Sequence, residues 1–308
     1  MRPNGWHLTE DLDEFLTRAW GFLCSRPAPH TTPLTAIEKL RTRGAGGAPT
    51  QAGSTAFGWL VEDGAVRAAL LRPPTGRLTL TALSPGQADS LAAHLAGPGP
   101  RPCGVLSDDE TATAFAGAWR RHTGAAAVRS WGARLHRLGT LTPPRRPPAG
   151  RGRVVGEREH GQLMWWCREF AADVGEAVTI DAESWAGTRF AEKRYTFWET
   201  PDGTPVSMAG ANPLVGGQVR IDPVYTPAGQ RGRGYAAAVT TEVTRAALAA
   251  GAAEVVLFTD PANRTSNALY RRLGYVPLAD FCAYDFTHAG RHPQASGRRG
   301  AQGARHGH

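Results

Sequence analysis

The sequence of 308 residues contains no apolar run of about 18 residues, the minimum for a helix that crosses a membrane. Its first residues include several acidic side chains and lack the apolar core of about 7 to 15 residues that a secretory signal requires. Hydrophobic residues make up 41% of the chain and charged residues 20%, proportions that are typical of a folded protein. We therefore expect a soluble, cytoplasmic protein with no membrane partner.

Cysteine is scarce. The chain has only Cys24, Cys103, Cys167 and Cys282, which form neither a Cys-x-x-Cys pair nor a Cys/His cluster at the spacing of zinc ligands. The sequence therefore predicts buried free thiols and no metal.

Lysine is almost absent. Lys39 and Lys193 are the only lysines, and arginine supplies the rest of the positive charge. The net charge of +8 could indicate a nucleic-acid partner. Many of the arginines, however, fall in Gly- and Pro-rich segments, where charge does not form a docking face. We expect no nucleic-acid partner.

Proline and glycine divide the chain. The segment TPPRRPPAGRGR (142–153) cannot continue a helix or a central strand, because proline lacks the amide donor. We interpret it as a linker between one domain at 1–141 and a second at 154–286. Residues 287–308 have too little apolar content to fold and are expected to be a disordered tail. The Gly-rich stretch 43–54 is expected to be a loop.

Hydrophobic periodicity in the second half predicts the order α-α-β-β-β-α-β-α-β. Its first helix is indicated by Leu163, Trp166, Phe170 and Val174, and a second helix is expected over 182–193. The first half gives the same order in weaker form and begins with a helix expected over 8–24. Residues 105–124 align with 256–275 without a gap, which indicates an internal duplication. The predicted fold is α/β, with two mixed-sheet domains in tandem.

The stretch TPAGQRGRGYA (226–236) follows a strand-like run and opens a helix. Glycines permit positive φ and close approach, so successive amides can converge on one anion at the positive end of the helix dipole. Arg231 and Arg233 add fixed positive charge. This arrangement is typical of a site for phosphate or pyrophosphate.

Two other phosphate motifs fit less well. No GKS or GKT follows the glycines, so the stretch is not a Walker loop. Gly232, Gly234 and Ala237 satisfy GxGxxA, but residues 227–231 separate them from the strand, and Glu254 begins the next strand instead of ending it. The RGRG does not repeat, as an RNA-binding tract would.

Two motifs resemble the GNAT superfamily of acetyl-CoA-dependent acetyltransferases. Arg231, Gly234 and Ala236 match its signature Q/R-x-x-G-x-G/A at the start of a helix. Asn263, seven residues before Tyr270, and the closing Leu-Gly-Tyr at 273–275 match a second pattern. The resemblance covers about 151–286.

The resemblance implies that acetyl-CoA is the co-substrate and that no metal takes part. In this family a strand end binds the pantetheine arm through its main chain, and the glycine-rich loop binds the pyrophosphate. The implied residues are Val224, Tyr225 and Thr226 for the pantetheine, and Arg231, Gly232, Arg233, Gly234, Tyr235 and Ala236 for the pyrophosphate.

The same resemblance gives Tyr270 a catalytic role, in which its phenol protonates the departing thiolate; the alternative is a packing residue. Asn263, Asn267 and Tyr270 share one helix face at i, i+4 and i+7, so both asparagines are candidate cofactor contacts. Asn263 can equally be an N-cap. Asp222 is the nearest acidic candidate for a general base, although its side chain can also face away.

The first half lacks these features. Ala112 stands in place of Asn263, Trp119 in place of Tyr270, and no RGRG follows the matching strand. We expect a degenerate domain that does not bind CoA and that shapes the acceptor side, as in tandem members of the superfamily.

We expect an N-acetyltransferase in which a primary amine attacks the thioester directly while an amide near Thr226 polarises the carbonyl. The acceptor would be a small molecule or a peptide, and the protein a monomer or homodimer. Alternatives are an idle acyl-CoA-binding or regulatory module and a mycothiol-synthase-like acetyltransferase. One group of aromatic and acidic residues predicts either a pocket for a cationic amine or simply core and solvated surface: Trp165, Trp166, Trp185, Phe197, Trp198, Glu169, Asp173, Glu176, Asp181 and Glu183.

Overall fold

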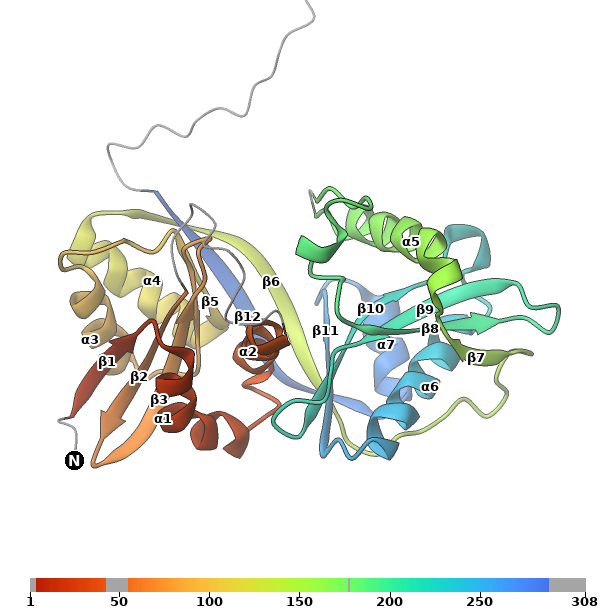
Figure 1. The fold of residues 1–308 in the computed structure, drawn as a ribbon, viewed down its shortest axis with the longest axis horizontal. Coiled ribbons are helices and arrows are strands. Elements are labelled where there is room, and N and C mark those ends of the chain that lie inside the picture. Colours follow the sequence, from red (N-terminus) through yellow and green to blue (C-terminus); the bar gives the residue numbers. More distant parts are fainter. Residues whose placement is uncertain (1–3, 43–54, 177, 288–308) are drawn as a thin grey trace, which may run out of the picture.

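The structure is a computed structural model that describes residues 4–42, 55–176 and 178–287. Seven α-helices pack on one 12-stranded mixed sheet within these residues (Figure 1). The helices are α1 (Leu12–Ser25), α2 (Thr31–Thr42), α3 (Pro85–Leu95), α4 (Asp109–Thr123), α5 (His160–Asp173), α6 (Tyr235–Ala249) and α7 (Arg264–Arg272). The strands are β1 (Gly5–Thr9), β2 (Ala56–Glu62), β3 (Ala65–Arg72), β4 (Arg77–Leu80), β5 (Gly104–Asp108), β6 (Ala126–Leu138), β7 (Arg151–Val154), β8 (Arg194–Glu199), β9 (Pro205–Ala211), β10 (Gln218–Tyr225), β11 (Glu254–Thr259) and β12 (Tyr275–Thr287).

The order of strands reads in the same way from either edge of the sheet. It runs β1-β2-β3-β4-β5-β12-β6-β11-β10-β9-β8-β7. The only parallel pairs among these described strands are β4 with β5 and β10 with β11, which occupy matching positions in the two halves. The fold is therefore two mixed α/β units in tandem, as the sequence predicted.

The two halves exchange their closing strands. Residues 134–137 of β6 pair with β11 of the second half, and residues 281–285 of β12 pair with β5 of the first half. Between these contacts β6 and β12 run antiparallel to each other across the middle of the sheet (Figure 1). The hydrophobic pattern did not indicate this exchange, which makes each half incomplete without a strand from the other.

Each face of the sheet carries its own helices. Helices α1, α2 and α5 cover one face through two clusters that include Phe15 and Trp59 in the first half and Trp166 and Phe197 in the second. Helices α3, α4, α6 and α7 cover the opposite face. In the centre, the connection between α1 and α2 packs through Ala28 on the exchanged strands.

The second predicted helix, over 182–193, is wrong. The segment contains only a 3₁₀ turn, η2 (Trp185–Gly187). Asp181 accepts a hydrogen bond from the Ser184 N–H at 2.8 Å, and the Ser184 hydroxyl donates to the Thr179 carbonyl at 3.0 Å. Such side-chain bonds compete with the helical ladder. Glu192 then takes a left-handed φ of +62°, which a helix cannot contain.

Both edge strands were also missed. β1 occupies the start of the segment expected to be helix 8–24, and α1 begins only at Leu12. β7 begins at Arg151, inside the segment expected to be a linker, where it pairs with β8. The expected loop at 43–54 and nearly all of the expected tail lie outside the described residues.

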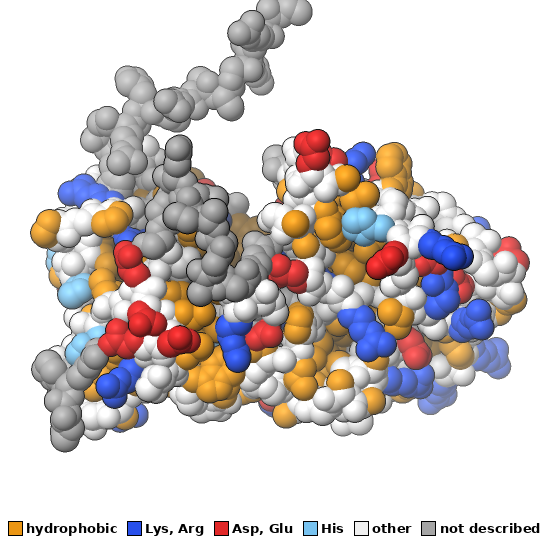
Figure 2. Space-filling model, viewed as in Figure 1, with side chains coloured by type: hydrophobic (Ala, Val, Ile, Leu, Met, Phe, Trp, Pro, Cys, Tyr) orange, Lys and Arg blue, Asp and Glu red, His pale blue; other side chains and the backbone are white. Residues whose placement is uncertain are grey.

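The four cysteines are all free, but they differ in burial. Cys167 and Cys282 are buried, Cys24 is intermediate and Cys103 is exposed, so the expectation of buried thiols is wrong for Cys103. No helix among the described residues is long and apolar enough to span a membrane. Figure 2 shows side chains of both signs on the face in view, with the basic ones more frequent at the right, in the area of α6 and β7, and the acidic ones more frequent at the left.

Candidate functional site

The central parallel strands separate at their C-terminal ends. Residues 218–221 of β10 pair with 254–257 of β11, whereas both strands continue beyond that pairing. Pro223 has no amide to donate, and the register of β10 against β9 shifts between Ile221 and Val224. The end of β10 therefore follows β9 alone and leaves an opening on its β11 side.

Side chains fix the direction of the main chain at this opening. The Tyr225 carbonyl accepts a hydrogen bond from the Ser207 hydroxyl of β9 at 3.0 Å, so it points toward β9. Successive residues of a strand direct their main-chain groups to opposite sides. The N–H and C=O of Val224 consequently face the opening.

The loop after β10 leads directly into helix α6. It contains the short turn η3 (Ala228–Gln230) and two glycines with left-handed backbones, Gly232 at φ +77° and Gly234 at φ +84°. Gly234 is the N-cap of α6 and supplies no side chain to its first amides. A Cβ on Gly232 would meet no atom within 4 Å, so the mouth of this loop is open.

The main-chain donors of this loop have no acceptor. The first α6 amide with a partner is that of Ala238, which bonds to the Gly234 carbonyl at 3.1 Å. No described residue accepts a hydrogen bond from the N–H groups of residues 232–237. Unpaired amides at a helix N-terminus attract anions, because they add donors to the positive end of the dipole.

The two arginines of the loop are not equivalent. Arg231 donates through Nε to the Thr226 carbonyl at 2.9 Å and forms an ion pair with Asp173 of α5. Its charge is therefore already balanced, and it ties the end of β10 to α5. Arg233 is exposed and forms no ion pair with any described residue, so it is the better candidate to face an anion.

Tyr270 lies on α7, where only 8% of its surface is exposed. Its ring packs edge-on against Tyr275, with the centroids 6.0 Å apart. Burial raises the pKa of the Tyr270 phenol, which therefore stays protonated at neutral pH. No described residue hydrogen-bonds its hydroxyl, whereas the Tyr275 hydroxyl lies 2.7 Å from that of Thr244.

The two asparagines of the predicted helix face have local roles. Asn263 caps α7 by accepting a hydrogen bond from the Ser266 N–H at 3.0 Å. Asn267 donates to the carbonyls of Asp260 and Asn263 at 2.8 Å and accepts from the Thr259 hydroxyl at 2.8 Å. These bonds use the polar atoms of Asn267 to fix the turn between β11 and α7. They leave none for the cofactor contact that the sequence suggested.

Asp222 is not placed as a general base would be. Its Oδ2 accepts from Lys193, and from Arg189 at 2.6 Å. Burial alone would raise the pKa of Asp222, but the charges of Lys193 and Arg189 hold it well below its ordinary value. A carboxylate in this state is a poor proton acceptor at neutral pH.

Sequence reasoning missed both partners of Asp222. Lys193 has a side chain that is only 2% exposed, and burial lowers its pKa to about 8. Arg189 also binds Glu176 through two bonds of 2.7 and 2.9 Å, and its guanidinium lies 4.4 Å from the centre of the Phe190 ring. Together they fasten the irregular segment 178–193 to β10. The sequence feature that could have pointed to Lys193 is that it is one of only two lysines in the chain.

Six of the aromatic and acidic residues proposed for a cation pocket have partners within the described residues. Trp166 and Phe197 belong to the core under α5, and Trp198 to the core under α6. Of the acids, Asp173 pairs with Arg231, Glu176 pairs with Arg189, and Glu169 accepts from the Tyr225 hydroxyl at 3.2 Å. These contacts fit the alternative of aromatic core and solvated acidic surface, because the side chains of Asp173 and Glu176 remain 49% and 38% exposed within their ion pairs.

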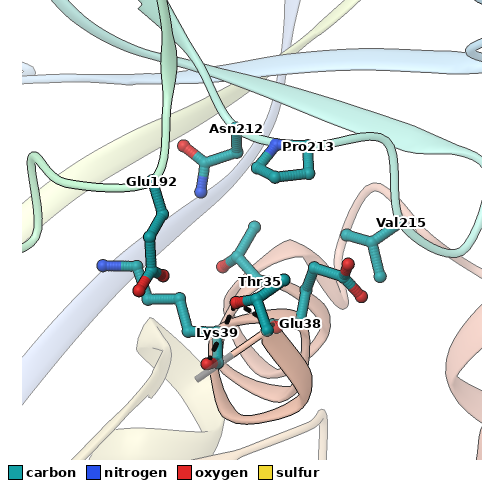
Figure 3. Close-up of a pocket in the computed structure, with 8 residues that line it drawn as sticks. Thr35, Glu38, Lys39, Glu192, Asn212, Pro213 and Val215 are labelled. Carbon is teal, nitrogen blue, oxygen red and sulfur yellow. Dashed lines mark hydrogen bonds between the residues drawn. The ribbon is translucent and has the colours of Figure 1, made fainter. Parts of the chain in front are cut away.

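A small pocket lies between α2 and the second half (Figure 3). Asn212 and Glu192 point toward the α2 side chains across it. Its cavity volume of about 10 Å³ suits about one water molecule, so it is too small for an acceptor. The pocket is lined by Thr35, Glu38, Lys39, Thr42, Glu192, Asn212, Pro213 and Val215.

The matching helix of the first half is closed by its own residues. Ser84 accepts from the Gln87 N–H at 3.2 Å, while the Gln87 side chain accepts from the Ser84 N–H at 2.9 Å. Pro85 removes one further amide. Trp119, in the position of Tyr270, is fully buried and packs on Phe115. Of the amides in this first turn, only that of Gly86 has no acceptor among the described residues, against the six of residues 232–237.

A comparison with protein-family models matches residues 161–275 to the acetyltransferase (GNAT) family. This part of the chain is a GNAT domain. The matched segment includes the opening at β10, the unpaired donors of α6 and Tyr270. A search of the curated proteins found no match.

Solved structures share the fold over nearly the whole chain. A GCN5-related N-acetyltransferase from Sphaerobacter thermophilus is 17% identical, with a TM-score of 0.56, and the match covers 92% of this chain and 96% of that one. A Drosophila protein is 11% identical, with a TM-score of 0.62 and coverages of 92% and 99%. A tandem GNAT protein from the clavulanic acid biosynthesis pathway is 11% identical, with a TM-score of 0.50 and coverages of 94% and 100%. At these identities the likeness shows the fold alone, here a GNAT fold in tandem.

Proposed function

We propose that the protein is an N-acetyltransferase that moves an acetyl group from acetyl-CoA to a primary amine. The observation that carries this proposal is the row of unpaired main-chain donors at residues 232–237, beside the opening between β10 and β11. A diphosphate supplies the acceptors that these donors lack. The opening would then receive the pantetheine arm along the free main-chain groups of Val224.

In the proposed reaction the acetyl group passes directly from the coenzyme to the amine. The amine nitrogen attacks the thioester carbonyl, whose oxygen accepts a hydrogen bond from the N–H of Val224. The new C–N bond forms as the C–S bond breaks, and the protonated Tyr270 gives its proton to the leaving sulfur. Because Asp222 is held as a paired carboxylate, we assign the loss of the amine proton to water instead.

The proposal is tested by a screen of primary amines, small molecules and peptides, with acetyl-CoA and detection of the released thiol. Turnover that depends on one class of amine supports it. Calorimetry with acetyl-CoA alone separates catalysis from binding, because an idle acyl-CoA-binding module would bind and release no thiol. Absence of binding would contradict the proposed donors themselves.

Charge at the mouth of the loop should control binding of the coenzyme. Gly232→Asp places a carboxylate beside the proposed diphosphate, and we expect acetyl-CoA affinity to fall at least about tenfold, equal to about 1.4 kcal/mol. Gly232→Asn is the matched control, because Asn and Asp have the same shape and both tolerate positive φ. Affinity is measured by calorimetry at two salt concentrations. Equal losses for the two variants would show that charge at this position is not involved.

The first half should not bind the coenzyme. Its helix start is capped by Ser84 and Gln87, so titration of the full chain is expected to give a single acetyl-CoA site per chain. The measurement is calorimetric stoichiometry with protein of known active concentration. A second site of similar affinity that persists in Gly232→Asp would place a functional cradle in the first half and contradict this expectation.

A further inference from the structure

The face of β10 beneath α2 carries an unusual row of polar side chains. Val219 and Ile221 pack in the core under α6, so Gln218, Arg220 and Asp222 face the opposite side, where α2 and α5 lie. Thr31 at the start of α2 confirms this direction, because its hydroxyl bonds to the Gln218 side-chain oxygen at 3.0 Å.

Arg220 is a cation without an ion pair. No described carboxylate lies within salt-bridge distance of it, and its Nε is buried without an acceptor among the described residues. The nearest acid, Asp222, is already shared by Lys193 and Arg189, and Glu176 is bound by Arg189. Three cations therefore face two carboxylates, which leaves one positive charge in excess.

An anion at Arg220 would balance this excess charge, which water reaches over only part of the side chain. Burial lowers the pKa of Arg220, and the charge of Asp222 opposes that change. The neighbouring Gln218 is fully buried, and its Nε2 donor also has no acceptor among the described residues. Two donors on the same side of one strand thus lack an acceptor, while Arg220 itself keeps part of its surface exposed.

The position of Arg220 separates it from the coenzyme. The unpaired amides that would bind the diphosphate belong to α6, on the opposite face of the sheet. Arg220 immediately precedes Ile221, where β10 and β11 part, and lies about 13 Å along the strand from Val224. An anion at Arg220 would therefore be part of the acceptor, reaching the thioester from the face of α2 and α5.

We propose that Arg220 binds a carboxylate of the acceptor, so that the acceptor is a small amine whose carboxylate lies several bonds away from the reacting nitrogen, as in the side-chain amine of lysine. The proposal rests on the proposed function, because it names the acceptor of that same reaction. One excess positive charge matches one carboxylate, and the guanidinium fork suits its two oxygens.

The test compares acceptors that differ in this carboxylate, with each rate expressed per unprotonated amine, because the loss of a carboxylate also lowers the pKa of an adjacent amine. The common L-amino acids and the matching amino-acid amides serve as paired acceptors with acetyl-CoA. We expect kcat/KM to be at least about tenfold higher for the best acid than for its amide, as for a charged hydrogen bond gained. In Arg220→Gln this ratio should fall close to one, and Arg220→Lys should restore part of it.

Two controls separate a loss of the carboxylate contact from a general loss of activity or of folding. Arg67→Gln removes an exposed arginine of β3 in the first half and should leave the ratio unchanged. Thermal unfolding checks that each variant is folded. Equal loss of activity on acids and amides in Arg220→Gln, or a wild type that prefers the amides, would overturn the proposal.

Binding supplies a readout that does not need turnover. In the presence of CoA, N-acetyl amino acids should raise the unfolding temperature of the wild type more than their amides do, and Arg220→Gln should remove that difference. Lack of the difference in the wild type counts against the carboxylate site. Intact acetyl-CoA binding without turnover on any amine counts against the proposed function instead.

Discussion

Replacing Tyr270 by phenylalanine is expected to lower kcat by about 10²- to 10⁴-fold, the usual contribution of a positioned general acid. The phenol is buried and its pKa is raised by that burial, so it holds a proton that the leaving thiolate can take. Its hydroxyl is not bonded to any described residue, so its loss leaves no protein group without a partner. Acetyl-CoA affinity should therefore stay within about threefold of the wild type.

The neighbouring ring offers a matched control. Tyr275→Phe removes the same atom from a buried tyrosine, but that hydroxyl is bonded to Thr244. We expect a loss of about 1 kcal/mol in the free energy of unfolding and a kcat within a few-fold of the wild type. Measurements are thiol release for turnover and calorimetry for binding. Unchanged kcat in Tyr270→Phe would remove the phenol from the mechanism, and loss of binding would give it a structural role.

The loop between β10 and α6 could be predicted from the sequence because its chemistry is local. Glycines with positive φ, a preceding strand and a following helix all lie within about twenty residues, and the donors follow from helix geometry. The structure adds what the motif does not contain. Arg231 is engaged with Asp173 from another helix, 58 residues earlier in the chain.

Asp222 shows where such prediction stops. It was the nearest acid to the loop, but its protonation depends on Arg189 and Lys193, which are 33 and 29 residues away in the sequence. The segment that contains Arg189 and Lys193 was expected to be a helix. A helix prediction does not indicate that both cations contact the same carboxylate. Periodicity describes single elements, whereas this site depends on contacts between them.

The exchanged strands escaped prediction for a similar reason. Alternation identifies β6 and β12 as strands but does not say which strands they pair with. The exchange of strands indicates what the first half contributes, although it is not expected to bind the coenzyme. Its strand β6 places Arg134 opposite Thr259 at the end of β11. The ring centroids of Trp131 and Phe258 are 6.2 Å apart. A half whose own helix start is capped by Ser84 and Gln87 thus completes the sheet beside the proposed acyl-transfer site.

Lys193→Met should have the largest effect on stability, a loss of about 3 kcal/mol in the free energy of unfolding. The side chain of Lys193 is 2% exposed and donates both to the Asp222 carboxylate and, at 2.9 Å, to the Asp222 carbonyl. Methionine has a similar length, so packing is kept while these donors are lost. Arg189 remains as a partner, which places the loss at the lower end of the range for broken buried pairs.

Urea denaturation measures the difference, and Arg194→Met is the control, since this exposed neighbour should change stability by no more than about 0.5 kcal/mol. If Lys193 and Asp222 act as a unit, the double variant Lys193→Met/Asp222→Asn should lose less free energy of unfolding than the sum of the two single variants. The reason is that Asp222→Asn removes the carboxylate charge that Lys193→Met leaves without its lysine. Additive losses, or a Lys193→Met variant as stable as the control, would mean that Arg189 alone holds segment 178–193 on β10. The surface proposed to bind the acceptor would then be held in place by the Arg189–Asp222 ion pair alone. The cluster of Lys193, Arg189 and Arg220, in which Arg220 keeps an unbalanced charge, would not be needed to hold it.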